Sequence, residues 1–173
     1  LVENGNPSIP EEPTSTTWYI DNAEQTGKTF NYAKTFPGAA VRIESVASTI
    51  RGVPINAVKF YPSDAGTMLF ARWVPGNMPT FAASIEVPVE DVYTAAPANN
   101  AGAKTYILSE TITLATNELL LCKWNDQATA EDTAGFWVNA GAGGDYAVSV
   151  WKVADNTAGD ENWGLPFSIG YVK

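Results

Sequence analysis

TYIL (residues 105–108), TITL (111–114), ELLLCKW (118–124), GFWV (135–138), DYAVSVW (145–151) and LPFSIGYV (165–172) are the segments that decide the fold of this 173-residue chain. Each is short and rich in β-branched and aromatic residues, and Gly, Asn, Asp or Pro residues separate one from the next. This pattern is typical of β-strands separated by turns. None of these segments is long and periodic enough to predict a helix. The second half of the chain is therefore predicted to be all-β.

The first half of the chain repeats this pattern. Strand-like runs occur at TWYI (17–20), KTFNYAKTF (28–36), AVRIESV (40–46), INAVKFY (55–61), TMLFARWV (67–74) and FAASIEV (81–87). In all there are about eleven candidate strands without an intervening helix, which predicts two packed sheets rather than one open sheet. The predicted fold is a two-sheet β-sandwich that occupies residues 16–173 as a single domain.

Residues 1–15 differ in composition from the rest of the chain. They contain PSIPEEPT at 7–14, with a proline at every third position. Such a segment is extended and cannot form a core of its own. It is interpreted either as a linker or as an N-terminal arm that docks on a neighbouring subunit, and the sequence leaves both open.

The charge of the chain bears on its partners. Nineteen acidic and ten basic residues give a net charge of −9. Binding to nucleic acid draws on clustered Lys and Arg, and the basic residues here are scattered, so nucleic acid is not an expected partner. No apolar stretch approaches the roughly 20 residues that cross a bilayer, so no membrane span is predicted.

Two features argue against catalysis. The chain has no histidine, which removes the usual general base and every Ser-His-Asp or Cys-His arrangement. Adjacent acids such as Glu11–Glu12, Glu131–Asp132 and Asp160–Glu161 point apart on a loop or strand and match no motif. We therefore predict that the protein is not an enzyme. The single cysteine, Cys122, lies in the apolar run 118–124 and is predicted to be buried and inert.

Several of the strand segments resemble a known family. NAVKFYPSD (56–64), a strand that ends in ARW (71–73), and IEV (85–87) are similar to the cleaved-adhesin-like jelly rolls of secreted, surface-attached bacterial proteins. That family includes the adhesin regions of gingipain-type proteases. WYIDN (18–22) resembles its opening strand, and FSIGYV (167–172) resembles its closing strand.

The resemblance extends over residues 17–173. It implies a jelly-roll topology, a secreted protein associated with the cell surface, and a non-catalytic accessory or adhesion role. Ala23 and Cys122 stand at positions where members of the family often carry glycine, so the backbone geometry at Cys122 is expected to differ from the family's.

A calcium site is the first candidate for ion binding. Calcium takes six to eight oxygen ligands from carboxylates, amides and carbonyls. Two groups offer such ligands: Asp21, Asn22 and Glu24 near the opening strand, and Asp155, Asp160 and Glu161 in an acidic loop. The resemblance implies that the first and last strands are neighbours, which would bring the two groups together.

A second candidate is a binding surface formed by aromatic residues. Trp124, Trp151 and Trp163 lie near strand ends or loops, where binding residues gather, and their rings can stack on sugars. Polar contacts would come from Asn125, Asp126 and Asp145. The other three tryptophans considered, Trp18, Trp73 and Trp137, are assigned to the core.

Two functions follow from these observations. The first is a non-catalytic extracellular adhesion or ligand-binding module for a protein or carbohydrate, stabilised by calcium. The alternative is a self-assembling subunit of an extracellular filament or matrix, in which residues 1–15 add a strand to the sheet of a neighbour.

Overall fold

The computed structural model describes residues 15–24, 30–32, 39–43, 50–78, 80–98, 101–125, 137–140, 148–152, 157–158, 163–164 and 166–173. The strands are β1 (Thr16–Asp21), β2 (Phe30–Tyr32), β3 (Ala39–Ile43), β4 (Pro54–Phe60), β5 (Gly66–Trp73), β6 (Ile85–Val89), β7 (Lys104–Thr113), β8 (Leu119–Trp124), β9 (Val138–Ala140), β10 (Val148–Lys152), β11 (Thr157–Ala158), β12 (Trp163–Gly164) and β13 (Ser168–Val172). A short 3₁₀ turn, η1 (Asn22–Glu24), follows β1. The predicted all-β character is confirmed.

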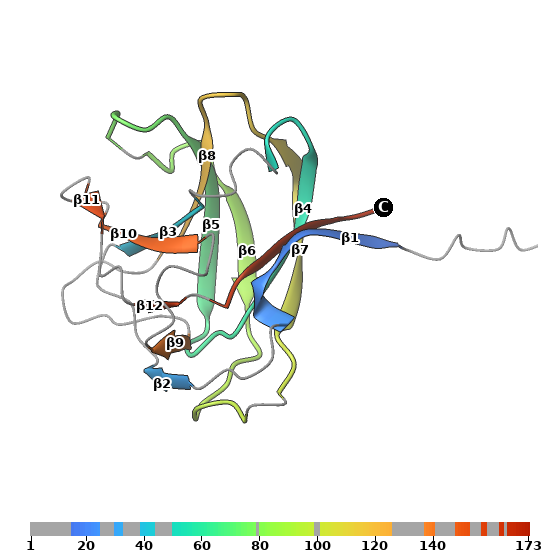
Figure 1. The fold of residues 1–173 in the computed structure, drawn as a ribbon, viewed down its shortest axis with the longest axis vertical. Coiled ribbons are helices and arrows are strands. Elements are labelled where there is room, and N and C mark those ends of the chain that lie inside the picture. Colours follow the sequence, from blue (N-terminus) through green and yellow to red (C-terminus); the bar gives the residue numbers. More distant parts are fainter. Residues whose placement is uncertain are drawn as a thin grey trace, which may run out of the picture.

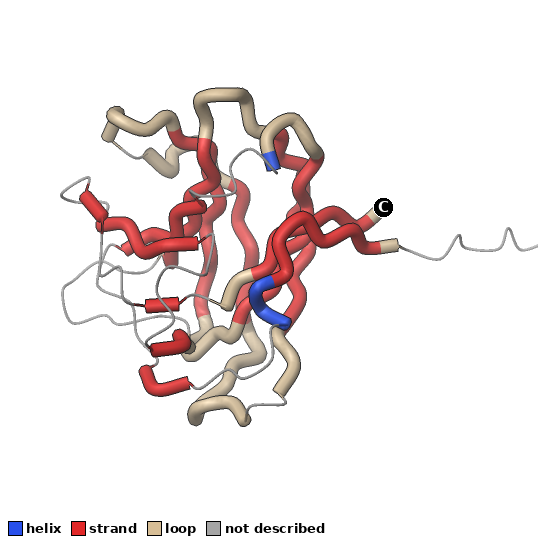
Figure 2. The backbone as a smooth tube through the Cα atoms, viewed as in Figure 1, coloured by secondary structure: helices blue, strands red, loops and turns tan. Residues whose placement is uncertain are grey.

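Two antiparallel sheets form the body of the molecule. One has the order β1-β13-β4-β7 and the other β11-β10-β3-β8-β5-β6, and a small third sheet has the order β12-β9-β2. Figure 1 shows the two main sheets as layers, and Figure 2 shows how little of the described chain is helical. This arrangement is compatible with the predicted β-sandwich. The expected number of about eleven strands is not confirmed, because the described residues form thirteen strands, some of only two residues.

The main core lies between the two sheets. The four-stranded sheet contributes side chains from every one of its strands, including Ile20, Phe60, Leu108 and Ile169, and the facing sheet contributes from β5, β6 and β8. Aromatic stacking orders the centre of this core, where the ring centroid of Phe60 lies 4.8 Å from that of Tyr106 and 5.4 Å from that of Phe167. Alternate residues along each strand face inward, as the pleat of a strand requires.

Strands β5 and β8 are buried on both faces. Leu120 and Cys122 face the main core, and Leu119 and Leu121 form a second cluster with Trp73 on the other face of the sheet. This two-sided burial explains why β8 reads as a continuous apolar run rather than as an alternating pattern. Cys122 is fully buried, as predicted.

The three tryptophans assigned to the core lie in three different environments. Trp73 is buried in the second cluster, as predicted. Trp137 is half-buried and packs against the cluster of Ala23 and Tyr61. The assignment of Trp18 is wrong, because its ring is not part of the core between the sheets. The ring lies over Gly170, and the Lys59 ammonium lies 4.1 Å from the ring centroid.

Among the described residues, no helix has the length and apolarity that crossing a membrane requires.

Gly170 is the position at which this packing tolerates least change. It pairs with Trp18 on one side and with Ala57 on the other. A Cβ atom at residue 170 would lie 2.7 Å from Trp18 Cε3 and would also overlap the carbonyl oxygen of Thr17. The contact therefore requires a residue without a side chain.

We expect Gly170→Ala to lower the free energy of unfolding by about 1–3 kcal/mol, because β1 must move away from β13 to make room. Urea unfolding followed by tryptophan fluorescence measures the change. Gly102→Ala is the matched control, since a Cβ atom there meets nothing within 4 Å. Equal stability of the two variants would contradict the predicted role of Gly170.

Candidate functional site

The first and last strands are neighbours, as the calcium prediction required. β1 pairs with β13 in antiparallel fashion, with Asp21 opposite Ser168. Ser168 Oγ donates a hydrogen bond to Asp21 Oδ1 at 2.9 Å and accepts one from the backbone N–H of Ala23 at 2.9 Å. The Lys59 ammonium lies 3.0 Å from the same carboxylate oxygen.

These contacts give the Asp21 carboxylate a partner within the fold, while its predicted role as a calcium ligand stays a prediction. An ammonium group already neutralises the carboxylate, and its positive charge opposes a second cation at the same oxygen. Asp21 is an ion-pair partner that links β1 to β4 across β13. Within the described residues there is no group of three or more His, Cys, Asp or Glu side chains that could hold a metal ion.

The remaining candidates for calcium are placed only in part. Asp155, Asp160 and Glu161 lie outside the described residues, and only the backbone of Glu24 is described. Between Asp155 and Asp160, the described residues are Thr157–Ala158, which form β11 at an edge of the six-stranded sheet. Asp21 belongs to the other main sheet, the four-stranded one. Calcium binding by the acidic loop stays a prediction.

The predicted binding role of Trp124 is wrong. Its side chain is only 2% exposed and belongs to the main core. Alternate side chains of a strand point to the same face, so Trp124 points inward with Leu120 and Cys122. This holds although Trp124 is the last residue of β8. No face of the ring is left for a ligand.

The other predicted binding residues are distributed over several elements. Asn125 is exposed, and its backbone N–H donates a hydrogen bond to the carbonyl of Thr67 at 2.8 Å. Only the backbones of Trp151 and Trp163 are described, in β10 and β12, which lie close together. Asp126 and Asp145 lie outside the described residues. The predicted set therefore does not form one surface with Trp124.

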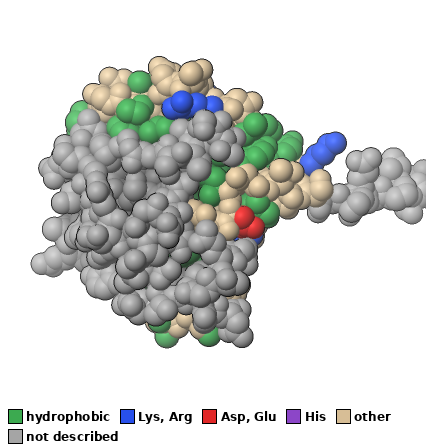
Figure 3. Space-filling view, in the orientation of Figure 1, with side chains coloured by type: hydrophobic (Ala, Val, Ile, Leu, Met, Phe, Trp, Pro, Cys, Tyr) green, Lys and Arg blue, Asp and Glu red, His purple; other side chains and the backbone are tan. Residues whose placement is uncertain are grey.

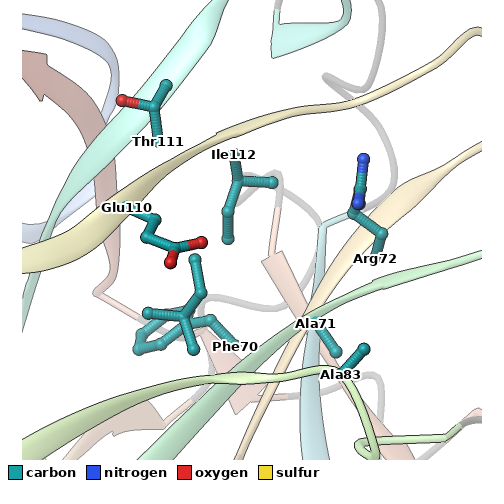
Figure 4. A pocket seen from close by; sticks show the side chains of 8 residues that line it. Phe70, Ala71, Arg72, Ala83, Glu110, Thr111 and Ile112 are labelled. Atoms are coloured by element: carbon teal, nitrogen blue, oxygen red, sulfur yellow. The ribbon is translucent and has the colours of Figure 1, made fainter.

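A pocket that the sequence analysis missed opens between β5, β6 and β7. Its lining residues come from all three strands and the residues just before β6: Phe70, Ala71, Arg72, Ala83, Ile85, Glu110, Thr111 and Ile112. Figure 4 shows Glu110 and Ile112 pointing into this space, Thr111 pointing away from it, and Arg72 on the side opposite Glu110. The pocket has a volume of about 120 Å³.

Two irregularities in strand pairing create the pocket. The pairing of β5 with β6 ends at Phe70↔Ile85, whereas its pairing with β8 continues to Trp73↔Leu119. On the facing sheet, the β4–β7 register passes from Ile55↔Ile112 to Ala57↔Ile107, so β7 contains extra residues between these pairs. Bulges of this kind bend a strand and change where its side chains point.

The pocket has an apolar floor and a charged rim. Phe70, Ile85 and Ile112 continue the main core at its base. Arg72 and Glu110 are exposed, and within the described part of the chain neither forms an ion pair. The pocket thus offers a carboxylate and a guanidinium on opposite sides of an apolar surface.

A second polar cluster lies at the other end of β7. The Lys104 ammonium lies 2.7 Å from Asp91 Oδ2 and 4.5 Å from the ring centroid of Tyr93. Burial, together with smaller effects of the charges of Asp91 and Tyr93, raises the pKa of the neighbouring Tyr106 to about 12. Tyr106 is therefore neutral at physiological pH, and the contacts of Lys104 with Asp91 and Tyr93 join the segment after β6 to β7.

Comparisons with known proteins assign no family to this site. No protein-family model matches the chain, and no match is found among curated proteins or solved structures.

We expect Ser168→Ala to destabilise the fold by about 1–3 kcal/mol, because the buried N–H of Ala23 loses its acceptor. Ser168 is fully buried. Thermal or urea unfolding measures the effect, with the exposed Ser109→Ala as the control on β7. A Ser168 variant as stable as the control would show that Ser168 does not hold β1, β13 and η1 together.

Proposed function

We propose that this chain is a non-catalytic extracellular adhesion or ligand-binding module that contacts its partner through the pocket between β5, β6 and β7. The observation that carries the proposal is a carboxylate and a guanidinium, Glu110 and Arg72, held without ion-pair partners in the described residues over an apolar floor. The resemblance to cleaved-adhesin-like domains suggests the same role, together with secretion and attachment at the cell surface.

The size of the pocket bears on the kind of partner. Sites that enclose a whole small ligand usually measure about 300–1,000 Å³. A pocket of about 120 Å³ suits one protruding group of a larger partner, such as a side chain of a protein or one substituent of a glycan. A protein is favoured, because an apolar side chain next to a charged group would match both the floor and the rim.

We also infer a jelly-roll topology. The strand orders β1-β13-β4-β7 and β3-β8-β5-β6 support it, since the chain passes from one sheet to the other at every step between these strands except the β5–β6 hairpin. Two interleaved Greek keys give this alternation. In this topology the pocket lies between the β5–β6 hairpin and β7.

Binding to arrays of immobilised extracellular matrix proteins and glycans tests the proposed function. We expect the wild-type chain to bind a protein ligand, and Glu110→Gln or Arg72→Gln to weaken that binding by about tenfold or more, equivalent to about 1.4 kcal/mol. The matched control is Glu86→Gln, which removes the same charge from an exposed position on β6 outside the pocket.

Two outcomes would contradict the proposal. One is no binding to any protein or glycan on the arrays. The other is binding that the pocket variants and the control weaken equally, which would place the contact elsewhere on the surface.

The second candidate function is a self-assembling filament or matrix subunit in which residues 1–15 add a strand to a neighbouring sheet. The observation that favours it is the position of β1, an edge strand that follows directly after this segment. We expect removal of residues 1–14 to abolish any filaments or oligomers larger than a dimer that are seen by electron microscopy and size-exclusion chromatography. Ser15 is retained in this variant because its carbonyl accepts the N–H of Lys173. Filaments that survive the deletion would contradict the role of the arm.

A further inference from the structure

The free edge of β1 is the feature from which a further interaction surface follows. β1 is the first strand in the order β1-β13-β4-β7, and within the described residues it pairs only with β13. Figure 1 shows β1 and the end of β13 extending together away from the rest of the sandwich. Figure 3 shows hydrophobic side chains at the surface where these two strands join the body.

The hydrogen-bond pattern shows which groups face this edge. The Lys173 N–H donates to the Ser15 carbonyl at 3.0 Å, which makes these two residues a hydrogen-bonded pair. Bonded and non-bonded pairs alternate along an antiparallel ladder, so Thr17 is bonded to β13, while Thr16 and Trp18 are not. The N–H and C=O groups of Thr16 and Trp18 therefore point outward.

Asn56 gives independent support for this assignment. Its Oδ1 accepts the N–H of Val172 at 2.7 Å, and its Nδ2 donates to the Val172 carbonyl at 3.0 Å. Val172 is the residue opposite Thr16. Since its polar groups are directed toward β4, they are not available to Thr16.

This edge has few of the features that usually prevent strand pairing. Natural sheets protect their edges with Lys, Pro, charges or bulges. β1 has the sequence TTWYID, without Lys or Pro, and its one charged residue, Asp21, is ion-paired with Lys59. The only irregularity lies between Trp18 and Ile20, which leaves Thr16–Trp18 regular and uncharged.

We propose that a second copy of this chain binds this edge, with β1 antiparallel to β1 about a two-fold axis at Thr17. In that register Thr16 faces Trp18 of the second copy, and their outward N–H and C=O groups hydrogen-bond to one another. The symmetry repeats this pair on the other side of the axis. The two four-stranded sheets become one continuous sheet.

A second copy is favoured over an unrelated strand because the edge is complementary to itself. Thr16 and Trp18 lie one residue to either side of Thr17, so a two-fold axis at Thr17 places the outward groups of each opposite those of the other. The Asp21 side chains lie at opposite ends of the joint, and among the described residues that face one another in this register no charge meets a like charge. This interaction is independent of the pocket proposal, and it gives the self-assembly candidate a route that does not use the N-terminal arm.

Sedimentation velocity of the full chain over a wide range of concentrations tests the inference. We expect a reversible dimer, and we expect Thr16→Pro to raise its dissociation constant at least about tenfold, because proline removes an outward N–H and leaves the bonds to β13 intact. Thr16→Val is the matched control, since it retains the N–H and the β propensity, and it should dimerise as the wild type does.

Because each chain carries a charge of −9, raising the salt concentration should strengthen the dimer by screening the repulsion between the two chains.

Thr16→Lys is a second test that retains the backbone N–H and places like charges near each other across the joint. Thermal unfolding of each variant shows whether the monomer remains folded. The inference is supported if both the Pro and Lys variants are folded monomers where the wild type is a dimer. It is overturned if the wild type is monomeric at every concentration, if both variants dimerise as tightly as the wild type, or if removal of residues 1–14 alone abolishes the dimer.

Discussion

The pairing of the first strand with the last is the contact on which the sandwich depends. β13 lies between β1 and β4, so the four-stranded sheet cannot be complete until the chain ends are brought together. Closing so long a loop costs entropy, and the cost must be offset by contacts made in the assembled sheet. The row formed by Asp21, Ser168 and Lys59 and the close contact of Trp18 with Gly170 supply these contacts on the outer face.

The inner and outer faces of this sheet are stabilised by different means. The inner face is a conventional apolar core in which Phe60, Tyr106 and Phe167 stack. The outer face uses a lysine that is only 10% exposed, paired with a carboxylate and lying over an indole ring. A lysine can be buried in this way because its charge is compensated at both contacts.

The candidate site arises where the core ends. Along β5, the inward positions are Met68 and Phe70, and the next inward position is Arg72. Along β7, Glu110 stands between the inward residues Leu108 and Ile112. A charged residue at an inward position of a strand, where an apolar residue is expected, is the signal in the sequence that could locate the pocket. That signal is ambiguous, because one charged residue at an inward position is also compatible with a strand that simply leaves the core.

Two predictions, for Trp124 and Trp18, are wrong for related reasons. The position of Trp124 near a strand end suggests a binding role, but its side chain points into the core because it shares the inward face of β8 with Leu120 and Cys122. Trp18 was placed in the core because it is a tryptophan in a strand, but it lies over Gly170, on the opposite side from the main core. The sequence also gives no sign of the contact between Asp21 and Lys59, because the two residues are remote in sequence and come together only through β13.

The sequence by itself determined the all-β class, the presence of packed sheets and the burial of Cys122, because these depend on local propensity and on the alternation of apolar residues along each strand. The tertiary structure alone decided which strands are neighbours, which face of each strand is covered, and which charged groups meet. These properties depend on register and sheet order, and one residue of shift in register exchanges the two faces of a strand without changing its composition. For this reason the pocket, the Lys59–Asp21 pair and the free edge of β1 could be identified only in the folded chain.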